Sequence, residues 1–88
     1  MVTAFIEIEA TLRAVLADVL ALPADRAGAL TAESPLFGAL PELDSIAVAG
    51  LLTEIEDRFG ILIDDDDVDG DIFATFGALA RFIAAKRA

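Results

Sequence analysis

The sequence contains no cysteine and no histidine. Without cysteine the chain can form neither a disulfide nor a thiolate zinc site, and without histidine it cannot assemble a Ser-His-Asp triad. Any chemistry on a serine of this chain must therefore be carried out by another protein. These two absences argue that the chain is not itself an enzyme.

Basic residues are scarce as well. Six Lys and Arg stand against sixteen Asp and Glu, which gives a formal net charge of −10 at pH 7. The electric field of this negative charge repels the phosphates of nucleic acids and anionic lipids, and it attracts basic protein surfaces. We therefore expect no nucleic-acid partner, although the same charge would also keep a small apolar domain in solution without any partner.

Long uncharged runs are missing too. Although 57% of the residues are hydrophobic, no run without charge approaches the roughly 20 residues that a membrane span requires. The longest candidates, residues 45–53 and 72–80, fit core helices better. Glu7 and Glu9, with no basic opening before them, do not fit a secretory signal. The sequence predicts one cytoplasmic domain, residues 1–88, that is monomeric and does not insert into membranes.

Apolar residues at helical spacing predict three main helices. The first has Thr3 as its expected N-cap and ends before Pro23. Its apolar positions are Phe5, Ile8, Leu12, Val15, Val19 and Leu20. The second should begin at Asp44 or Ser45 and end near Gly60, which suits a C-cap. Its apolar side consists of Val48, Leu51, Leu52, Ile55 and Phe59. The last is capped by Thr75 and turns Phe76, Leu79, Phe82 and Ile83 inward.

The two connections between these helices differ in character. Residues 24–43 are long for a structureless link, so we expect an ordered loop held to the core by apolar residues. Those residues are Leu30, Leu36, Phe37 and Leu43. After Gly60, residues 61–63 lead into an acidic stretch, where we expect a loop and one short helical turn. The predicted fold is all-α, with four helices (one short) and a long ordered loop between the first and second.

Ser45 combines two features at the start of the second helix. Unpaired backbone N–H groups and the positive end of the helix dipole would face anything attached to its oxygen. Ile46, beside it, falls nearly opposite the apolar side of the helix, so a large aliphatic side chain is expected in solvent. Position alone also fits a plain structural role, in which Asp44 or Ser45 is an N-cap worth about 1 kcal/mol.

The surrounding residues resemble those of the acyl carrier proteins. Leu43-Asp44-Ser45-Ile46, followed by Leu51-Leu52, Ile55-Glu56 and Phe59-Gly60-Ile61, is similar to the Asp-Ser-Leu region of that family. The likeness continues at Leu36-Phe37, at residues 61–67 and at Thr75-Phe76-Gly77, and so covers nearly the whole chain. The resemblance implies an acyl-carrier-like helical bundle.

The resemblance also implies a function. In this family a phosphopantetheinyl transferase moves 4′-phosphopantetheine from coenzyme A to the serine, here Ser45, next to Asp44. The arm ends in a thiol that holds acyl groups as thioesters for partner enzymes of the acyl-activating, acyltransferase or ketosynthase type. The pathways implied are fatty-acid, polyketide or related acyl transfer. Residues 40–45, Leu-Pro-Glu-Leu-Asp-Ser, further resemble stand-alone carriers of exosortase-associated gene sets.

The sequence departs from the family in the first half of the second helix, where acids are common but residues 47–50 carry no charge. We therefore expect partners to rely on apolar contact near Ser45, with steering by acids further along. The predicted docking face comprises Ile46, Ala49, Gly50, Thr53, Glu54, Glu56 and Asp57.

Two other interpretations stay open at this point. Asp65, Asp67, Asp69 and Gly70 match the first half of an EF-hand calcium loop. The twelfth place, where a bidentate Glu belongs, is Phe76, so calcium binding at Asp65–Gly70 would be weak and no specific metal site is expected. The other alternative is an acidic interaction module of the same fold that is never modified.

Overall fold

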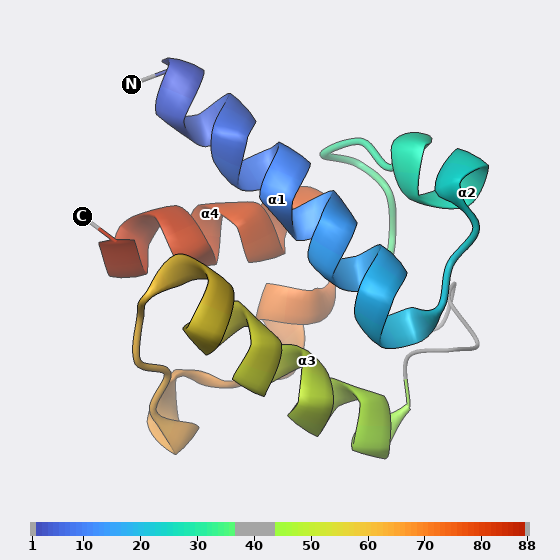
Figure 1. Ribbon diagram of the computed structural model, residues 1–88. Helices are drawn as coiled ribbons and strands as arrows, with labels where there is room; N and C mark the ends of the chain where they lie inside the picture. The colour runs from blue at the N-terminus through green and yellow to red at the C-terminus, as the bar shows by residue number, and fades with distance from the viewer. Residues whose placement is uncertain (1, 37–43, 88) are drawn as a thin grey trace.

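The computed structural model describes residues 2–36 and 44–87, and there the chain is all-α as predicted. Its elements are α1 (Val2–Leu20), α2 (Ala24–Gly28), α3 (Ser45–Phe59), the 3-10 helices η1 (Asp65–Asp67) and η2 (Gly70–Phe73), and α4 (Phe76–Arg87). Figure 1 shows α1 running obliquely above α3 and α4, and it contacts both. The start of α1 and the end of α4 lie on one side of the view, away from the first turn of α3. No helix in the described part is long and apolar enough to span a membrane.

The predicted boundaries of α3 and the predicted start of α4 are confirmed, whereas those around α1 need correction. Thr3 is not an N-cap, because α1 already begins at Val2. At the other end α1 stops at Leu20, since Ala21 takes a left-handed conformation with φ of 54° before Pro23 is reached. The residues after Pro23 form the short helix α2, where the sequence predicts an ordered loop. A helix of five residues is too short to show an apolar period in the sequence.

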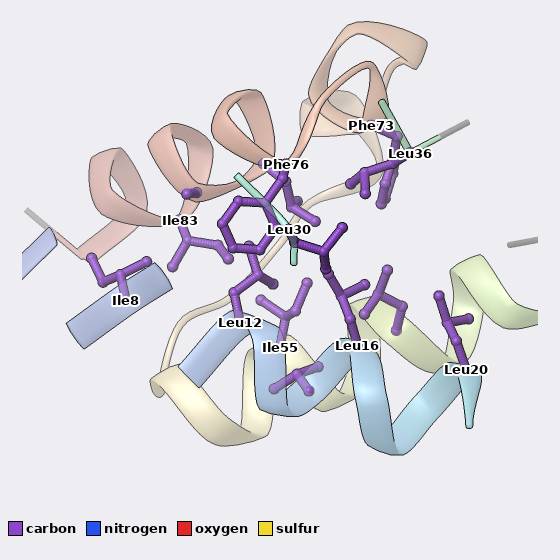
Figure 2. Packing of buried hydrophobic residues seen from close by; sticks show 14 of the residues in the cluster. Ile8, Leu12, Leu16, Leu20, Leu30, Leu36, Ile55, Phe73, Phe76 and Ile83 are labelled. Atoms are coloured by element: carbon purple, nitrogen blue, oxygen red, sulfur yellow. The ribbon is translucent and has the colours of Figure 1, made fainter. Parts of the chain in front are cut away.

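The core lies where the three longer helices meet (Figure 2). The fully buried side chains come from α1, α3, η2, α4 and the loop that contains Leu36, and include Leu12, Leu16, Leu36, Leu51, Ile55, Phe73, Phe76, Leu79 and Ile83. The predicted apolar faces of α3 and α4 are confirmed, with Val48, Leu52, Phe59 and Phe82 at their half-buried edges. Leu16 is also completely buried, although it does not belong to the predicted apolar face of α1.

Residues 29–36 of the link between α2 and α3 are held to the core. Leu30 and Leu36 are buried, as predicted, while Phe37 and Leu43 lie outside the described residues. Arg13 of α1 donates two hydrogen bonds to the Leu30 carbonyl, at 3.1 and 2.9 Å, and its guanidinium lies 5.1 Å from the centre of the Phe76 ring. One half-buried cation therefore holds the loop to both α1 and α4.

The same loop also completes the first turn of α4. The backbone N–H of Phe76 donates to the Ser34 carbonyl at 2.8 Å, and the Gly77 N–H donates to the Ala32 carbonyl at 2.9 Å. The hydroxyl of Thr75 accepts from the Ala78 N–H at 3.0 Å, which confirms Thr75 as a helix cap. The first backbone N–H groups of a helix have no partner within the helix itself. In α4, three of these groups are bonded to the loop or to Thr75 instead.

The acidic stretch is tied to the end of α4 by one ion pair. Lys86 contacts Asp67 of η1 at 2.5 Å, and the Asp67 carboxylate also accepts from the Asp64 N–H at 3.0 Å. The hydrogen bond from Lys86, followed by that from Asp64, lowers the pKa of Asp67 below its ordinary value of 3.8, and the bond to Asp67 raises the pKa of Lys86 above 10.5.

These shifts predict how stability depends on pH. Because the pKa of Asp67 is lowered in the folded state, its contribution is fully present above about pH 4 and is lost as the pH falls through the folded-state value. Because the pKa of Lys86 is raised, the contribution of Lys86 persists until the pH rises through a value above 10.5. Lys86→Met should therefore lower the melting temperature at neutral pH and lose this difference at strongly acidic pH. Thermal unfolding of both proteins by circular dichroism checks this; an offset that is independent of pH would contradict it.

Candidate functional site

Asp44 is the N-cap of α3. This residue is in the extended conformation, and its carboxylate accepts a hydrogen bond from the Ala47 N–H at 2.8 Å. The first intrahelical bond runs from the Val48 N–H to the Asp44 carbonyl at 2.9 Å. Ser45 is the first residue of the helix proper, and its side chain lies outside what the structure describes. The choice left open by the sequence is resolved in favour of Asp44 as the N-cap.

One stripe of α3 faces solvent along the length of the helix. The side chain of Ile46 is 85% exposed, which confirms the predicted exposed aliphatic residue beside Ser45. Gly50, Thr53 and Asp57 follow at steps of four, three and four residues, and all are exposed, as is Ala49 beside them. The Thr53 hydroxyl donates to the Ala49 carbonyl at 3.1 Å. The first three members of the stripe carry no charge.

Glu54 lies on the flank of α3 that faces α1. Its carboxylate accepts from the Arg58 guanidinium at 2.8 Å, and the same guanidinium donates to Asp18 of α1 at 2.6 Å. The hydrogen bonds to Asp18 and then Glu54 raise the pKa of Arg58. Glu54 is thus part of a bridge between two helices. No local pattern in the sequence indicates this bridge, because Asp18 and Arg58 are 40 residues apart.

Glu56 lies on the opposite flank of α3 and organises the chain that follows the helix. Its carbonyl accepts from the Gly60 N–H at 2.9 Å and the Ile61 N–H at 3.3 Å, and its carboxylate accepts from the Ile63 N–H at 2.8 Å. Gly60 has φ of 65°, which confirms the predicted C-cap. Residues 61–63 are held in an irregular path that buries Ile61 and leaves Leu62 82% exposed.

The acidic stretch after this point is arranged for local capping. The Asp69 carboxylate accepts from the N–H groups of Asp71 and Ile72 at 2.9 and 3.2 Å, and Asp67 is paired with Lys86. The side chain of Asp65 lies outside the described part of the chain. Phe76, at the place of the EF-hand glutamate, is completely buried. Among the side chains that the structure describes, no three acids gather as metal ligands.

Comparison with known proteins identifies the family. Residues 10–83 match the model of the family described as the phosphopantetheine attachment site. The chain belongs to this family, the acyl carrier proteins. It is also similar to the solution structure of a holo acyl carrier protein from Nitrosomonas europaea. The two share 44% identity over 90% of this chain and 93% of that one, with a TM-score of 0.81. No curated protein matches the chain.

Family membership settles the class of function. An acyl carrier protein is a carrier and not an enzyme, and its prosthetic group is phosphopantetheine. In general its partners are a phosphopantetheinyl transferase and enzymes of acyl pathways. The interpretation drawn from the sequence, a helical carrier that holds acyl groups for other proteins, is therefore confirmed. The match spans both serines of the chain, Ser34 and Ser45, and leaves the attachment residue to be argued from the geometry.

Proposed function

We propose that Ser45 carries the phosphopantetheine arm of this acyl carrier protein. The observation that supports this most directly is the capping of α3 by Asp44, whose carboxylate is bonded to the Ala47 N–H. Since Asp44 fills the capping role, the hydroxyl of Ser45 is not needed for it. A serine at the first position of a helix that another residue already caps is free to be modified without loss of the fold.

The first turn of α3 also suits a phosphodiester. Helix geometry leaves the N–H groups of Ser45 and Ile46 ahead of the first intrahelical bond, at the positive end of the helix dipole. The turn contains no acid after Asp44, and Ile46 beside the serine is exposed. Once attached, the arm supplies the thiol that a chain without cysteine lacks. Asp44 and the α3 backbone hold the attachment point, and the chain itself catalyses no step.

The other serine is poorly suited to the same role. The hydroxyl of Ser34 accepts from the Thr31 N–H at 2.8 Å, and the Ser34 carbonyl accepts from the Phe76 N–H at 2.8 Å. The Ser34 hydroxyl therefore supports the loop, and the Ser34 carbonyl supports the start of α4. A transferase would have to break these contacts to bring the Ser34 hydroxyl into its active site.

The finer assignment follows from the resemblance at residues 40–45. The protein would be a stand-alone, monomeric, cytoplasmic carrier of the exosortase-associated type, loaded by an acyl-activating enzyme or acyltransferase and unloaded by an acyltransferase or ketosynthase. The residues that support the subtype lie mostly in the part of the chain outside the described ranges. The exposed face of α3, from Ile46 to Asp57, is the surface proposed for these partners.

The test is to locate the modification. The purified protein is incubated with coenzyme A and a broad-specificity phosphopantetheinyl transferase, and the product is analysed by intact and fragment mass spectrometry. We expect a gain of one phosphopantetheine, carried by fragments that contain Ser45 but not Ser34. Modification on Ser34, or no gain while a known acyl carrier protein is modified in parallel, would overturn the assignment and favour the unmodified interaction module.

A further inference from the structure

The basic residues of this chain are almost all arginines. Of the six Lys and Arg residues, only Lys86 is a lysine. A guanidinium keeps its charge in a folded protein and does not act as a nucleophile, whereas a neutral lysine amine attacks acyl groups. The sequence also has no cysteine thiol and no histidine imidazole that could do so. Lys86 is therefore the one side-chain amine in a protein whose cargo is an acyl thioester.

The amine of Lys86 lies against a carboxylate that is itself held in place. The Lys86 Nζ is 2.5 Å from the Asp67 Oδ2, and the two side chains are 27% and 29% exposed. The same oxygen of Asp67 accepts a hydrogen bond from the Asp64 N–H at 3.0 Å. Solvent and small solutes can thus reach the amine, but they meet it beside a negative charge that the backbone of η1 keeps in position.

This arrangement opposes the reaction of the amine with a thioester. The ammonium must first give a proton to water. The nitrogen lone pair then attacks the thioester carbonyl carbon, the C–N bond of an amide forms, the C–S bond breaks, and the leaving thiolate takes up the proton that the nitrogen releases. The hydrogen bond to Asp67, followed by the charges of Asp67 and Asp64, raises the pKa of Lys86 and so disfavours the first step.

Acylation of Lys86 would also weaken the fold. An amide nitrogen carries no positive charge, so the Asp67 carboxylate would lose its ionic partner. The ion pair that ties η1 to the end of α4 would then be broken. One misdirected reaction would therefore consume an acyl group and loosen the carrier at the same time.

We infer that the Asp67 carboxylate protects Lys86 from N-acylation by acyl thioesters. The ion pair holds the one side-chain amine of this carrier as an ammonium, so that the amine neither removes acyl groups from loaded carriers nor loses its contact with η1. Lys86 is thus a modification site that its partner keeps unreactive. The inference rests on the acyl cargo of the family and not on which serine holds the arm.

The test is the rate at which a small neutral thioester, butanoyl-N-acetylcysteamine, acylates the purified protein at mildly alkaline pH. A neutral reagent is not repelled by the charge of −10. Mass spectrometry of fragments that contain Lys86 measures the product, with acylation of the α-amine as the internal reference. Asp67→Asn should raise the rate at Lys86 about two- to fivefold, as for the loss of one partly exposed ion pair. The new amide oxygen can still accept from the Asp64 N–H.

Two further variants control for charge and for the site. Asp66→Asn removes the same charge from the neighbouring exposed residue, which is not the carboxylate paired with Lys86, and should leave the rate close to that of the wild type. Lys86→Arg should abolish acylation of these fragments. Equal acceleration by Asp67→Asn and Asp66→Asn, or no acceleration by Asp67→Asn, would overturn the inference.

A titration separates charge from simple covering of the amine. Because the chain has one lysine, protein labelled with ¹⁵N-lysine gives one side-chain signal, which reports the pKa of Lys86 directly. This pKa should be lower in Asp67→Asn than in the wild type, and an unchanged pKa would show that Asp67 only covers the amine, against the inference. The thioester reacts whether or not Ser45 carries an arm, so failure here differs from a failure of the proposed function.

Discussion

Ser45→Ala is expected to abolish phosphopantetheine attachment while leaving the fold intact. The loss should be complete because a transferase forms a bond to one hydroxyl oxygen, and alanine offers none. The helix should tolerate the change because the cap of α3 is the Asp44 carboxylate, bonded to the Ala47 N–H at 2.8 Å. Removing a true cap would cost about 1 kcal/mol, whereas this variant should unfold within about 0.5 kcal/mol of the wild type. Intact mass after transferase treatment and thermal unfolding measure the two effects.

Ser34→Ala is the matched control, since Ser34 is the only other serine. This variant should accept one phosphopantetheine like the wild type. It should also be less stable by about 1 kcal/mol, because the Thr31 N–H loses its hydrogen bond to the Ser34 hydroxyl. Residual modification of the Ser45→Ala protein would show that a second attachment site exists.

Gly77→Ala is expected to destabilise the protein strongly, although alanine is the better helix former. A Cβ atom at Gly77 would lie 2.7 Å from the Ala32 carbonyl oxygen and 3.0 Å from the Ala32 Cβ. The loop backbone must then move away, which weakens the Gly77 N–H bond to the Ala32 carbonyl. Overpacking and the weakened bond together should cost about 2 to 4 kcal/mol, against which the gain in helix propensity of about 1 kcal/mol is small. Denaturant unfolding gives this free energy directly.

Gly28→Ala provides the comparison. Nothing lies within 4 Å of a Cβ built on Gly28, so alanine should be neutral or stabilise by up to about 1 kcal/mol. The same substitution at the two glycines should therefore change the free energy of unfolding in opposite directions or differ by several kcal/mol. Similar effects at both positions would show that the loop yields easily and that the close contact at Ala32 has little energetic weight.

The sequence predicted the elements whose signals are local. The start of α3, the cap at Thr75, the left-handed Gly60 and the exposure of Ile46 each follow from residues within one or two turns. The contacts that it did not predict join residues far apart in the chain. Arg58 reaches Asp18 over 40 residues, and Arg13 reaches the Leu30 carbonyl over 17.

The contacts of Glu54 and Glu56 were missed for the same reason. Glu54 and Glu56 sit on opposite flanks of α3, both are half-buried, and a helical wheel does not show which groups their carboxylates meet. Only the packing of α1 and the path after Gly60 show that Arg58 and the Ile63 N–H occupy their carboxylates. A composition of sixteen acids says how much negative charge is present but not which carboxylates are free to meet a partner.

The position of the chain ends bears on how such a carrier can be tethered. The start of α1 and the end of α4 lie on one side of the molecule in Figure 1, and the first turn of α3 lies on the other. A fusion partner, an affinity tag or a solid support joined at either end would lie on the side of the molecule away from the first turn of α3. The protein can therefore be immobilised through either terminus for measuring its encounters with enzymes, with the start of α3 left accessible.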